Sequence, residues 1–268
     1  MKNKEQIQNV KQKVLAKNRS ETTKDRMRYH LLDGLRGLTL ISMIIYHGLF
    51  DLVELYGVSI RWFFQTPGYV WQQSICWTFI LLSGFCWRLG RIPWRRGILI
   101  SACGLVITMV THFFMPSERI LFGILTFTGA AMLLLIPVSG VLQRMSQKAG
   151  LLASAFLFFL TRNVNRGYLG FENICLGKVP GVFYRGIGSA GLGFPAPGFF
   201  SGDYFSLFPW LFLYLCGFFL YGILMEQNAV KRMLCRRAGF LEWIGYHSLE
   251  IYMLHQPVLM LILECFFN

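Results

Sequence analysis

The sequence has few charged residues for its length. Only 15% of its 268 residues are Asp, Glu, Lys or Arg, whereas 54% are hydrophobic and 16% are aromatic. Soluble domains carry about 25% charged residues, so this composition excludes an ordinary soluble domain and indicates a membrane protein. We therefore expect a multi-pass protein of the cell membrane whose surface contacts the lipid bilayer.

Paired cysteines and metal-ligand spacings are also missing. The chain has seven cysteines, an odd number, and neither a CxxC pair nor Cys and His residues at zinc-ligand spacing. Most of these cysteines lie inside apolar runs, where a cysteine behaves as a small hydrophobic residue. We therefore expect neither a disulfide framework nor a metal site.

Acidic residues are scarce as well, with 13 Asp and Glu against 26 Lys and Arg. The basic residues flank apolar runs and do not alternate with aromatic residues on one surface, so we expect no nucleic-acid partner. If the N-terminus is cytoplasmic, the inner segments hold 20 Lys and Arg residues and the outer segments hold 6. This asymmetry predicts a cytoplasmic N-terminus.

Apolar runs of membrane-spanning length follow a basic tail at 1–27 and predict an all-α fold, a polytopic transmembrane bundle of about seven spans over 28–268. We expect the first, second, sixth and seventh spans to line a polar cavity. The Gly- and Pro-rich outer segment 162–204 exceeds an ordinary connection, so we expect a functional lid or a disordered loop. The predicted spans are about 35–56, 68–87, 97–115, 119–138, 149–163, 205–225 and 240–265.

The first span carries ionisable residues along nearly one helical face: Asp33, Arg36, His47 and Asp51. A charge at bilayer depth costs at least about 2.5 kcal/mol, so this stripe favours a functional lining. His47 and Asp51 are four residues apart, close enough for the carboxylate to hold the imidazole. Simpler explanations are an Asp33–Arg36 ion pair, an interhelical hydrogen bond from His47 and a hydrated Asp51 at the outer rim.

Five motifs in order carry a resemblance to a known family. The first span opens with LDGLRG at 32–37, and ten residues separate that motif's Arg from His47. The chain thereby resembles the heparan-α-glucosaminide N-acetyltransferase catalytic domain family, and more distantly the acyltransferase 3 family, over nearly everything after the basic tail. The other motifs are FILLSGF at 79–85, FGILTFTGAAMLL at 122–134, DYFSLFPWLFLYLCG at 203–217 and HSLEIYMLHQP at 247–257.

This resemblance implies acyl transfer across the bilayer. A cytoplasmic acyl-CoA, here acetyl-CoA, would donate its acyl group to a hydroxyl or amine of an extracytoplasmic sugar or envelope glycan. His47 would take the proton from the attacking group or carry the acyl group itself, since imidazole titrates near neutral pH. Asp51 would fix the tautomer of His47. Arg36 would pair with a CoA phosphate or with Asp33.

Other residues receive candidate binding roles from the same resemblance. His255 would contact substrate or CoA, or would simply pack. Asp203 would orient acceptor hydroxyls, or would cap a helix. Ser83 is a further candidate contact, although its hydroxyl could bond only to its own backbone. Thr126 stands where many relatives carry His, so a site built from that imidazole would be absent or replaced.

Two further function classes remain open from the sequence. The first is a transporter or proton-coupled carrier, in which Asp33, His47, Asp51 and His255 form a relay. The second is a non-catalytic partner in an envelope-assembly complex, for which 162–204 is the contact. The carrier would accumulate a solute without consuming CoA, which separates it from the enzyme.

Overall fold

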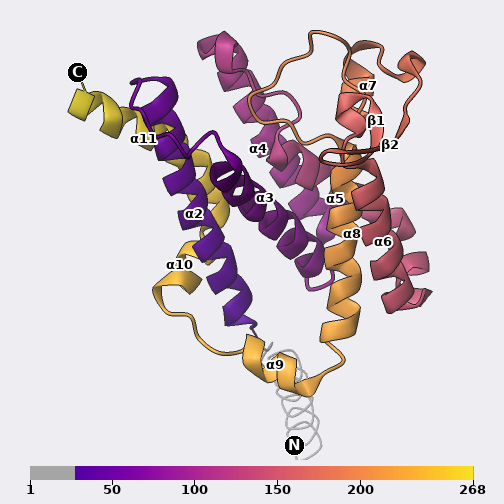
Figure 1. Ribbon diagram of the computed structural model, residues 1–268. Helices are drawn as coiled ribbons and strands as arrows, with labels where there is room; N and C mark the ends of the chain where they lie inside the picture. Colours follow the sequence, from indigo (N-terminus) through magenta and orange to yellow (C-terminus); the bar gives the residue numbers. More distant parts are fainter. Residues whose placement is uncertain (1–27, 268) are drawn as a thin grey trace, which may run out of the picture.

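The protein is a bundle of long helices that alternate in direction (Figure 1). The computed structural model describes residues 28–267, so the expected basic tail at 1–27 lies outside the described residues. The long helices are α2 (His30–Glu54), α3 (Thr66–Trp87), α4 (Pro93–Phe114), α5 (Ile124–Arg144), α6 (Gln147–Thr161), α8 (Leu207–Leu224) and α11 (Ser248–Phe267).

Within the described residues, five of these helices are long and apolar enough to cross a membrane, namely α2, α4, α5, α8 and α11. Of the other two expected spans, α3 carries the polar pair Gln72 and Gln73, and α6 has only 15 residues. An α-helix needs about 20 apolar residues to span the hydrocarbon core. The predicted helical bundle is confirmed, and five of its helices are candidate membrane spans.

The two ends of the bundle differ in charge and in structure. The connections after α3, α5 and α8 meet at one end, which we call the basic end, and the opposite end carries the strands and is called the hairpin end (Figure 1). α9 (Asn228–Leu234) and the beginning of α2 also lie at the basic end. The basic end collects Arg88, Arg91, Arg95, Arg96, Arg144, Lys148, Lys231, Arg232, Arg236 and Arg237.

The segment 162–204 is folded at the hairpin end, which rules out the disordered alternative. β1 (Tyr168–Phe171) pairs antiparallel with β2 (Ile174–Lys178), with a register irregularity between Leu169 and Gly170. Short helices follow this hairpin. They are the 3₁₀ turns η2 (Val164–Arg166) and η3 (Gly181–Phe183) and the helix α7 (Gly186–Leu192).

The predicted fourth span begins too early. Residues 119–123 follow the 3₁₀ turn η1 (Pro116–Glu118) and are not helical, and α5 starts only at Ile124. The backbone of this segment is engaged elsewhere, because Gly202 N–H donates to Arg119 O (3.1 Å) and Phe205 N–H donates to Phe122 O (2.8 Å). Hydrogen bonds to a segment 83 residues away thus displace the start of the helix.

The predicted seventh span, 240–265, is wrong as a single helix. The structure divides it at His247 into α10 (Phe240–Tyr246) and α11. α10 packs on the first half of α2 so closely that a Cβ on Gly245 would lie 1.7 Å from Asp33 O. Because Gly245 lacks this atom, α10 follows the beginning of α2 while α11 continues along its second half.

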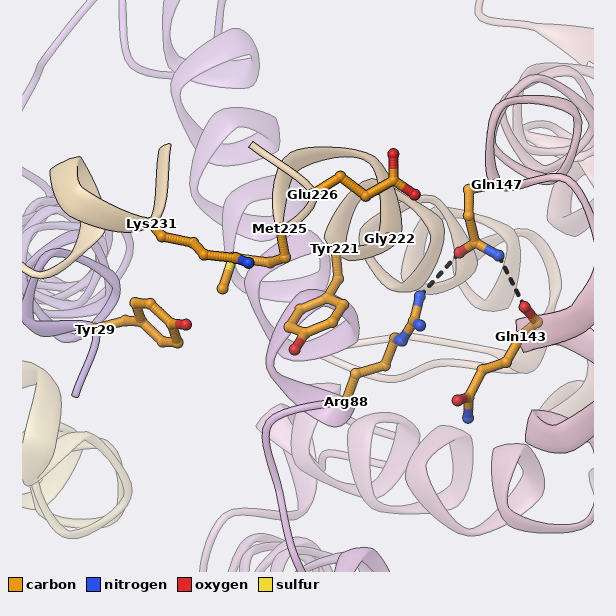
Figure 2. A pocket seen from close by; sticks show the side chains of 9 residues that line it. All are labelled: Tyr29, Arg88, Gln143, Gln147, Tyr221, Gly222, Met225, Glu226 and Lys231. Atoms are coloured by element: carbon orange, nitrogen blue, oxygen red, sulfur yellow. Dashed lines mark hydrogen bonds between the residues drawn. The ribbon is translucent and has the colours of Figure 1, made fainter. Parts of the chain in front are cut away.

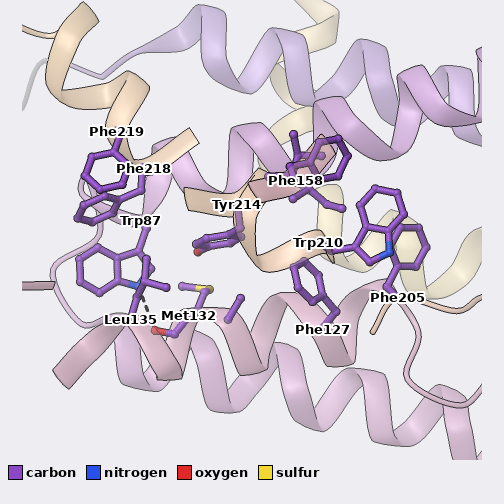
Figure 3. Close-up of a cluster of buried hydrophobic side chains, with 13 residues drawn as sticks. Trp87, Phe127, Met132, Leu135, Phe158, Phe205, Trp210, Tyr214, Phe218 and Phe219 are labelled. Atoms are coloured by element: carbon purple, nitrogen blue, oxygen red, sulfur yellow. Dashed lines mark hydrogen bonds between the residues drawn. The ribbon is translucent and has the colours of Figure 1, made fainter. Parts of the chain in front are cut away.

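The largest buried cluster lies between α3, α5, α6 and α8 (Figure 3). Tyr214 and Phe218 of α8 are fully buried, and Trp87 Nε1 donates to the Met132 carbonyl oxygen (3.0 Å). Within a bilayer, such packing and interhelical hydrogen bonds are what hold helices together. α8 is therefore the packing centre of this half of the bundle.

Two glycines allow α3 and α8 to approach each other to backbone contact. A Cβ on Gly84 would lie 2.0 Å from Tyr214 O, and one on Gly217 would lie 2.1 Å from Leu81 O. Both distances are well below van der Waals contact, so neither position accepts a side chain without separating the helices. Gly84 and Gly217 therefore set how closely α3 and α8 pack.

Candidate active site

The structure brings His47 and His255 together from helices far apart in the chain. His47 lies in the second half of α2 and His255 lies in α11. Their ring centroids are 5.2 Å apart with an interplanar angle of 65°, an edge-to-face contact. Two ionisable rings in contact inside a helical bundle form the centre of the candidate site.

Asp51 is next to this pair but is held by another residue. Its side chain is buried, and both carboxylate oxygens accept hydrogen bonds from Gln256 Nε2 (3.0 and 2.8 Å). Among the described residues, His47 makes no side-chain hydrogen bond with Asp51. The predicted contact, in which the Asp51 carboxylate orients the His47 imidazole, is therefore not formed. Gln256 was missed from the sequence, where its only signal is an amide side chain in an apolar run beside Pro257.

His255 has one ring nitrogen engaged and one free among the described residues. Its Nδ1 lies 2.5 Å from the Tyr252 carbonyl oxygen, one turn earlier in α11. Its Nε2 is buried and has no hydrogen-bond partner in the part of the chain that the structure describes. This nitrogen is thus available to a ligand or to His47.

The remaining residues of the predicted stripe lie near the basic end. Arg36 Nη1 lies 3.0 Å from Asp33 Oδ1, and Arg28 Nη2 lies 3.0 Å from Asp33 Oδ2. The local ion pair considered from the sequence is therefore formed. At 1.5 Å per residue, Arg36 and His47 are roughly 16 Å apart along α2, so the structure does not bring Asp33 and Arg36 to the imidazole pair.

Ser83 also lies away from His47. Its neighbours on α3, Phe85 and Cys86, pack with Leu32 at the beginning of α2. His47 is fifteen residues beyond Leu32, which corresponds to roughly 20 Å along the helix. The structure thus places Ser83 at the level of Asp33 and Arg36.

Asp203 caps a helix, but not the one that follows it. Its Oδ2 accepts a hydrogen bond from the backbone N–H of Ile124 (3.1 Å) at the start of α5. Burial raises the pKa of this carboxyl to about 6, an effect that the Ile124 hydrogen bond partly offsets. Asp203 therefore acts as a helix cap, the alternative considered from the sequence, and the residue that it caps lies 79 positions earlier in the chain.

We expect Asp203→Asn to raise the stability of the protein at pH 7.5. The pKa increase from 3.8 to about 6 corresponds to roughly 3 kcal/mol that ionisation removes from stability, and the amide oxygen can still accept from Ile124 N–H. The cost is absent below about pH 4 and complete above about pH 6. Melting in detergent should therefore show a higher Tm for the variant at pH 7.5 and equal values at pH 4. A lower Tm at pH 7.5 would contradict this account.

A polar cavity of about 410 Å³ opens at the basic end (Figure 2). Arg88 donates to Gln147 Oε1 (2.9 Å) and lies 4.8 Å from the centroid of the Tyr221 ring. Figure 2 shows Lys231 reaching in from the side opposite Arg88. None of the lining residues comes from α11, so this is not the cavity expected from the sequence. The lining is Tyr29, Arg88, Gln143, Gln147, Tyr221, Gly222, Met225, Glu226 and Lys231.

A second polar cluster anchors the hairpin to the bundle. Arg162, at the end of α6, donates to Gln73 Oε1 (2.9 Å) and to Tyr69 Oη (3.2 Å), both on α3. Tyr69 in turn donates to Glu172 Oε1 (2.6 Å) between the two strands, and the Arg162 guanidinium lies over the Trp210 ring. The hairpin is thereby fixed over the ends of α3, α6 and α8.

A family model for the catalytic region of heparan-alpha-glucosaminide N-acetyltransferase matches residues 28–257. The chain belongs to this family. The resemblance inferred from the five motifs is thus confirmed, and the imidazole pair lies inside the matched region. No curated protein and no solved structure matches the chain.

Membership in the heparan-alpha-glucosaminide N-acetyltransferase catalytic family implies acetyltransferase activity, and the family in general uses acetyl-CoA as donor. The apolar helices fit a membrane protein. Within residues 28–267, no group of three or more His, Cys, Asp and Glu side chains is placed to hold a metal ion.

Proposed function

We propose that this protein is a cell-membrane acyltransferase that moves an acetyl or acyl group from acyl-CoA at the basic end to a sugar or envelope glycan at the hairpin end. The observation that carries the proposal is the contact of His47 with His255 inside the helical bundle of a chain from an acetyltransferase family. We assign the basic end to the cytoplasm, since 12 of the 18 Lys and Arg residues within 28–267 lie there.

His47 is the residue on which the transfer depends. Its imidazole lies roughly 25 Å from the beginning of α2, in the half of the helix nearer the hairpin end. A neutral imidazole there can act as a base toward the acceptor or can accept the acyl group itself. Asp51 supports the two imidazoles of the site by holding Gln256, the residue next to His255 in the chain.

The cavity at the basic end provides a docking place for the CoA phosphates. Arg88 and Lys231 supply positive charge from α3 and α9, while Tyr29 and Tyr221 supply aromatic faces. Arginine binds phosphate by paired hydrogen bonds, and lysine binds it as a point charge. Arg36 is the alternative phosphate ligand predicted from the sequence, although its guanidinium is already paired with Asp33.

We expect Arg88→Gln to weaken acetyl-CoA binding by about 10- to 100-fold, since a hydrogen bond to a charged group contributes about 1.5–3 kcal/mol. Lys231→Gln should weaken it in the same direction. Arg144→Gln is the matched control, because Arg144 belongs to the same end but does not line the cavity. Titration of detergent-purified protein by calorimetry measures all three. Unchanged affinity in Arg88→Gln with a loss in Arg36→Ala would move the phosphate site to Arg36.

The acceptor reaches His47 from the hairpin end. Asp203 and the folded segment 162–204 are the candidate contacts for its hydroxyls or amine, with the Arg162 cluster holding the hairpin in place. Apolar side chains of this segment, such as Phe183 and Ile187, are exposed. An envelope glycan anchored in the outer leaflet would meet this surface directly.

The proposed function is tested by measuring whether the purified protein binds acetyl-CoA and transfers its acetyl group. Labelled acetyl-CoA and free CoA are titrated in parallel, and label transfer is then followed to a panel of amino sugars, neutral sugars and envelope glycan fractions. Saturable binding with transfer to one class of acceptor supports the proposal and decides between O- and N-acylation. No binding at millimolar acetyl-CoA would refute it and favour the carrier or the assembly partner.

A further inference from the structure

The segment 162–204 exposes large apolar side chains although it lies outside the long helices. Ile174 and Leu176 are 62% and 68% exposed, and they point to the same side of β2 because alternate residues of a strand share a face. The exposed apolar side chains of this segment include Ile174, Leu176, Val182, Phe183, Ile187 and Phe200. A soluble surface rarely gathers so many such groups, and their concentration marks a surface that contacts a partner or a membrane.

The length of α6 places the hairpin at the boundary of the bilayer. α6 begins at Gln147 at the basic end and has 15 residues, so it rises roughly 22 Å. The hydrocarbon core is about 30 Å thick, so a helix that starts at the cytoplasmic boundary ends in the outer half of the bilayer. β1 follows after the single 3₁₀ turn η2 and packs against α6 (Figure 1). The hairpin therefore lies near the outer boundary of the hydrocarbon core.

The hairpin cannot lie deeper than this boundary. β1 and β2 form a two-stranded sheet, so each strand keeps one edge without a neighbouring strand among the described residues. Open sheet edges facing lipid do not occur within the hydrocarbon region, because their N–H and C=O groups would lack partners. The headgroup region supplies water and phosphate for these groups and also allows apolar side chains to reach the acyl chains. This layer therefore fits both features of the hairpin.

All of the exposed charged residues in 162–204 are basic. They are Arg166, Lys178 and Arg185, and no salt bridge to a described residue holds any of them. The two acidic residues of the segment, Glu172 and Asp203, are half-buried, and their carboxylates accept hydrogen bonds from the bundle. The charge that this surface presents is therefore positive.

We propose that the exposed apolar side chains of 162–204, together with Arg166, Lys178 and Arg185, form a surface that binds anionic phospholipids of the outer leaflet. The apolar groups enter the boundary of the acyl chains, and the basic groups pair with the lipid phosphates. Long Lys and Arg side chains can reach from apolar surroundings to the headgroups. A soluble polyanion would pair with the charges but would leave the apolar side chains in water, so a lipid satisfies more of this surface.

The experiment measures which lipid gathers at this surface. In full-length protein, Cys265→Ser leaves Cys175 of β2 as the exposed cysteine among the described residues, and a fluorophore is attached there. The protein is placed in phosphatidylcholine nanodiscs that contain equal small amounts of either spin-labelled phosphatidylglycerol or spin-labelled phosphatidylcholine. Because a spin label quenches a fluorophore only at short range, the ratio of quenching by the two lipids measures the enrichment of the anionic lipid.

We expect phosphatidylglycerol to be enriched by about fivefold or more, the effect of one basic residue at an anionic surface. The combined Arg166→Gln, Lys178→Gln and Arg185→Gln variant should lower the quenching ratio to about 1. In the wild type the ratio should also fall as NaCl is raised from about 0.05 M to about 0.5 M, because salt screens exposed charges. This second measurement needs no variant and so does not depend on how the variant folds.

The matched control removes three positive charges from the opposite end of the bundle. Arg232→Gln, Arg236→Gln and Arg237→Gln together should leave the quenching ratio unchanged, since these residues follow α8 at the basic end. A ratio that persists in the variant of 162–204, or at high salt, would overturn the role of its three basic residues.

Two further outcomes would also contradict the proposal. Equal quenching by the two lipids in the wild type would overturn the recognition of anionic headgroups, and no quenching by either lipid would overturn the membrane contact. If inorganic polyphosphate changed the emission of the fluorophore while neither lipid quenched it, the surface would belong to a soluble polyanion.

Discussion

His47→Ala is expected to lower acetyl transfer by at least about 10³-fold, the largest effect of any single substitution in this chain. The reason is that His47, whose ring contacts that of His255, is the proposed base or acyl carrier, so its loss would remove the reacting group itself. The measurement is label transfer from acetyl-CoA by purified protein. The acetyl-CoA affinity should change little, because the charged cavity residues lie near the opposite end of the bundle.

The matched control for this prediction is His112→Ala. His112 is an exposed histidine in the last turn of α4, where it contacts only the neighbouring Phe113 ring among the aromatic residues described. Its replacement should leave transfer within about twofold of wild type, since surface changes have small effects. Transfer at the wild-type rate in His47→Ala would eliminate His47 as a catalytic residue. If cells that produce the His47→Asn variant keep the function of the wild-type protein, the alternative of a non-catalytic partner in an envelope-assembly complex is favoured.

Gly84→Ala is expected to lower the free energy of unfolding by about 2–4 kcal/mol, the largest effect on stability. The added methyl group would lie 2.0 Å from the Tyr214 carbonyl oxygen, which belongs to the backbone of α8 and cannot rotate away. Overpacking in a closely packed core typically costs 1–3 kcal/mol, and here two helices must separate. Melting curves in detergent, followed by size-exclusion chromatography, measure the loss.

Gly140→Ala provides the control for helix propensity. Gly140 also lies inside a candidate membrane-spanning helix, α5, but a Cβ at this position would meet nothing within 4 Å. Alanine favours helix by up to about 1 kcal/mol over glycine, so this variant should be equally stable or slightly more stable. Equal Tm values for the two alanine variants would contradict the close contact between α3 and α8.

The helices were predictable where charge or polarity ends an apolar run. Arg88 follows Trp87 directly, and the end of α3 was predicted at the correct residue. The errors occur where distant contacts decide the backbone. The hydrogen bonds of Arg119 and Phe122 to the segment before α8 delay α5, and the fit of Gly245 against Asp33 O divides the last predicted span. Neither contact leaves a local pattern in the sequence.

The individual residues of the candidate site were predictable from the sequence, but the contacts between them were not. His47 stands out as an ionisable residue in an apolar run, and His255 was found through the family resemblance. The sequence could not show that Asp51 pairs with Gln256, 205 positions away. The cavity at the basic end was missed for the same reason, because its lining combines the ends of α3, α5, α6, α8 and α9.

The packing of α2 against α10 and α11 also determines when the site can exist during synthesis. About 185 residues separate the end of α2 from the beginning of α10. At roughly 5–20 residues per second, the ribosome needs about 10–40 s to make them. During that interval α2 has already been made, but Asp51 still lacks Gln256 and His47 still lacks His255. α2 is therefore among the last of the described helices to reach its final environment, and the candidate site stays incomplete until α10 and α11 have been made.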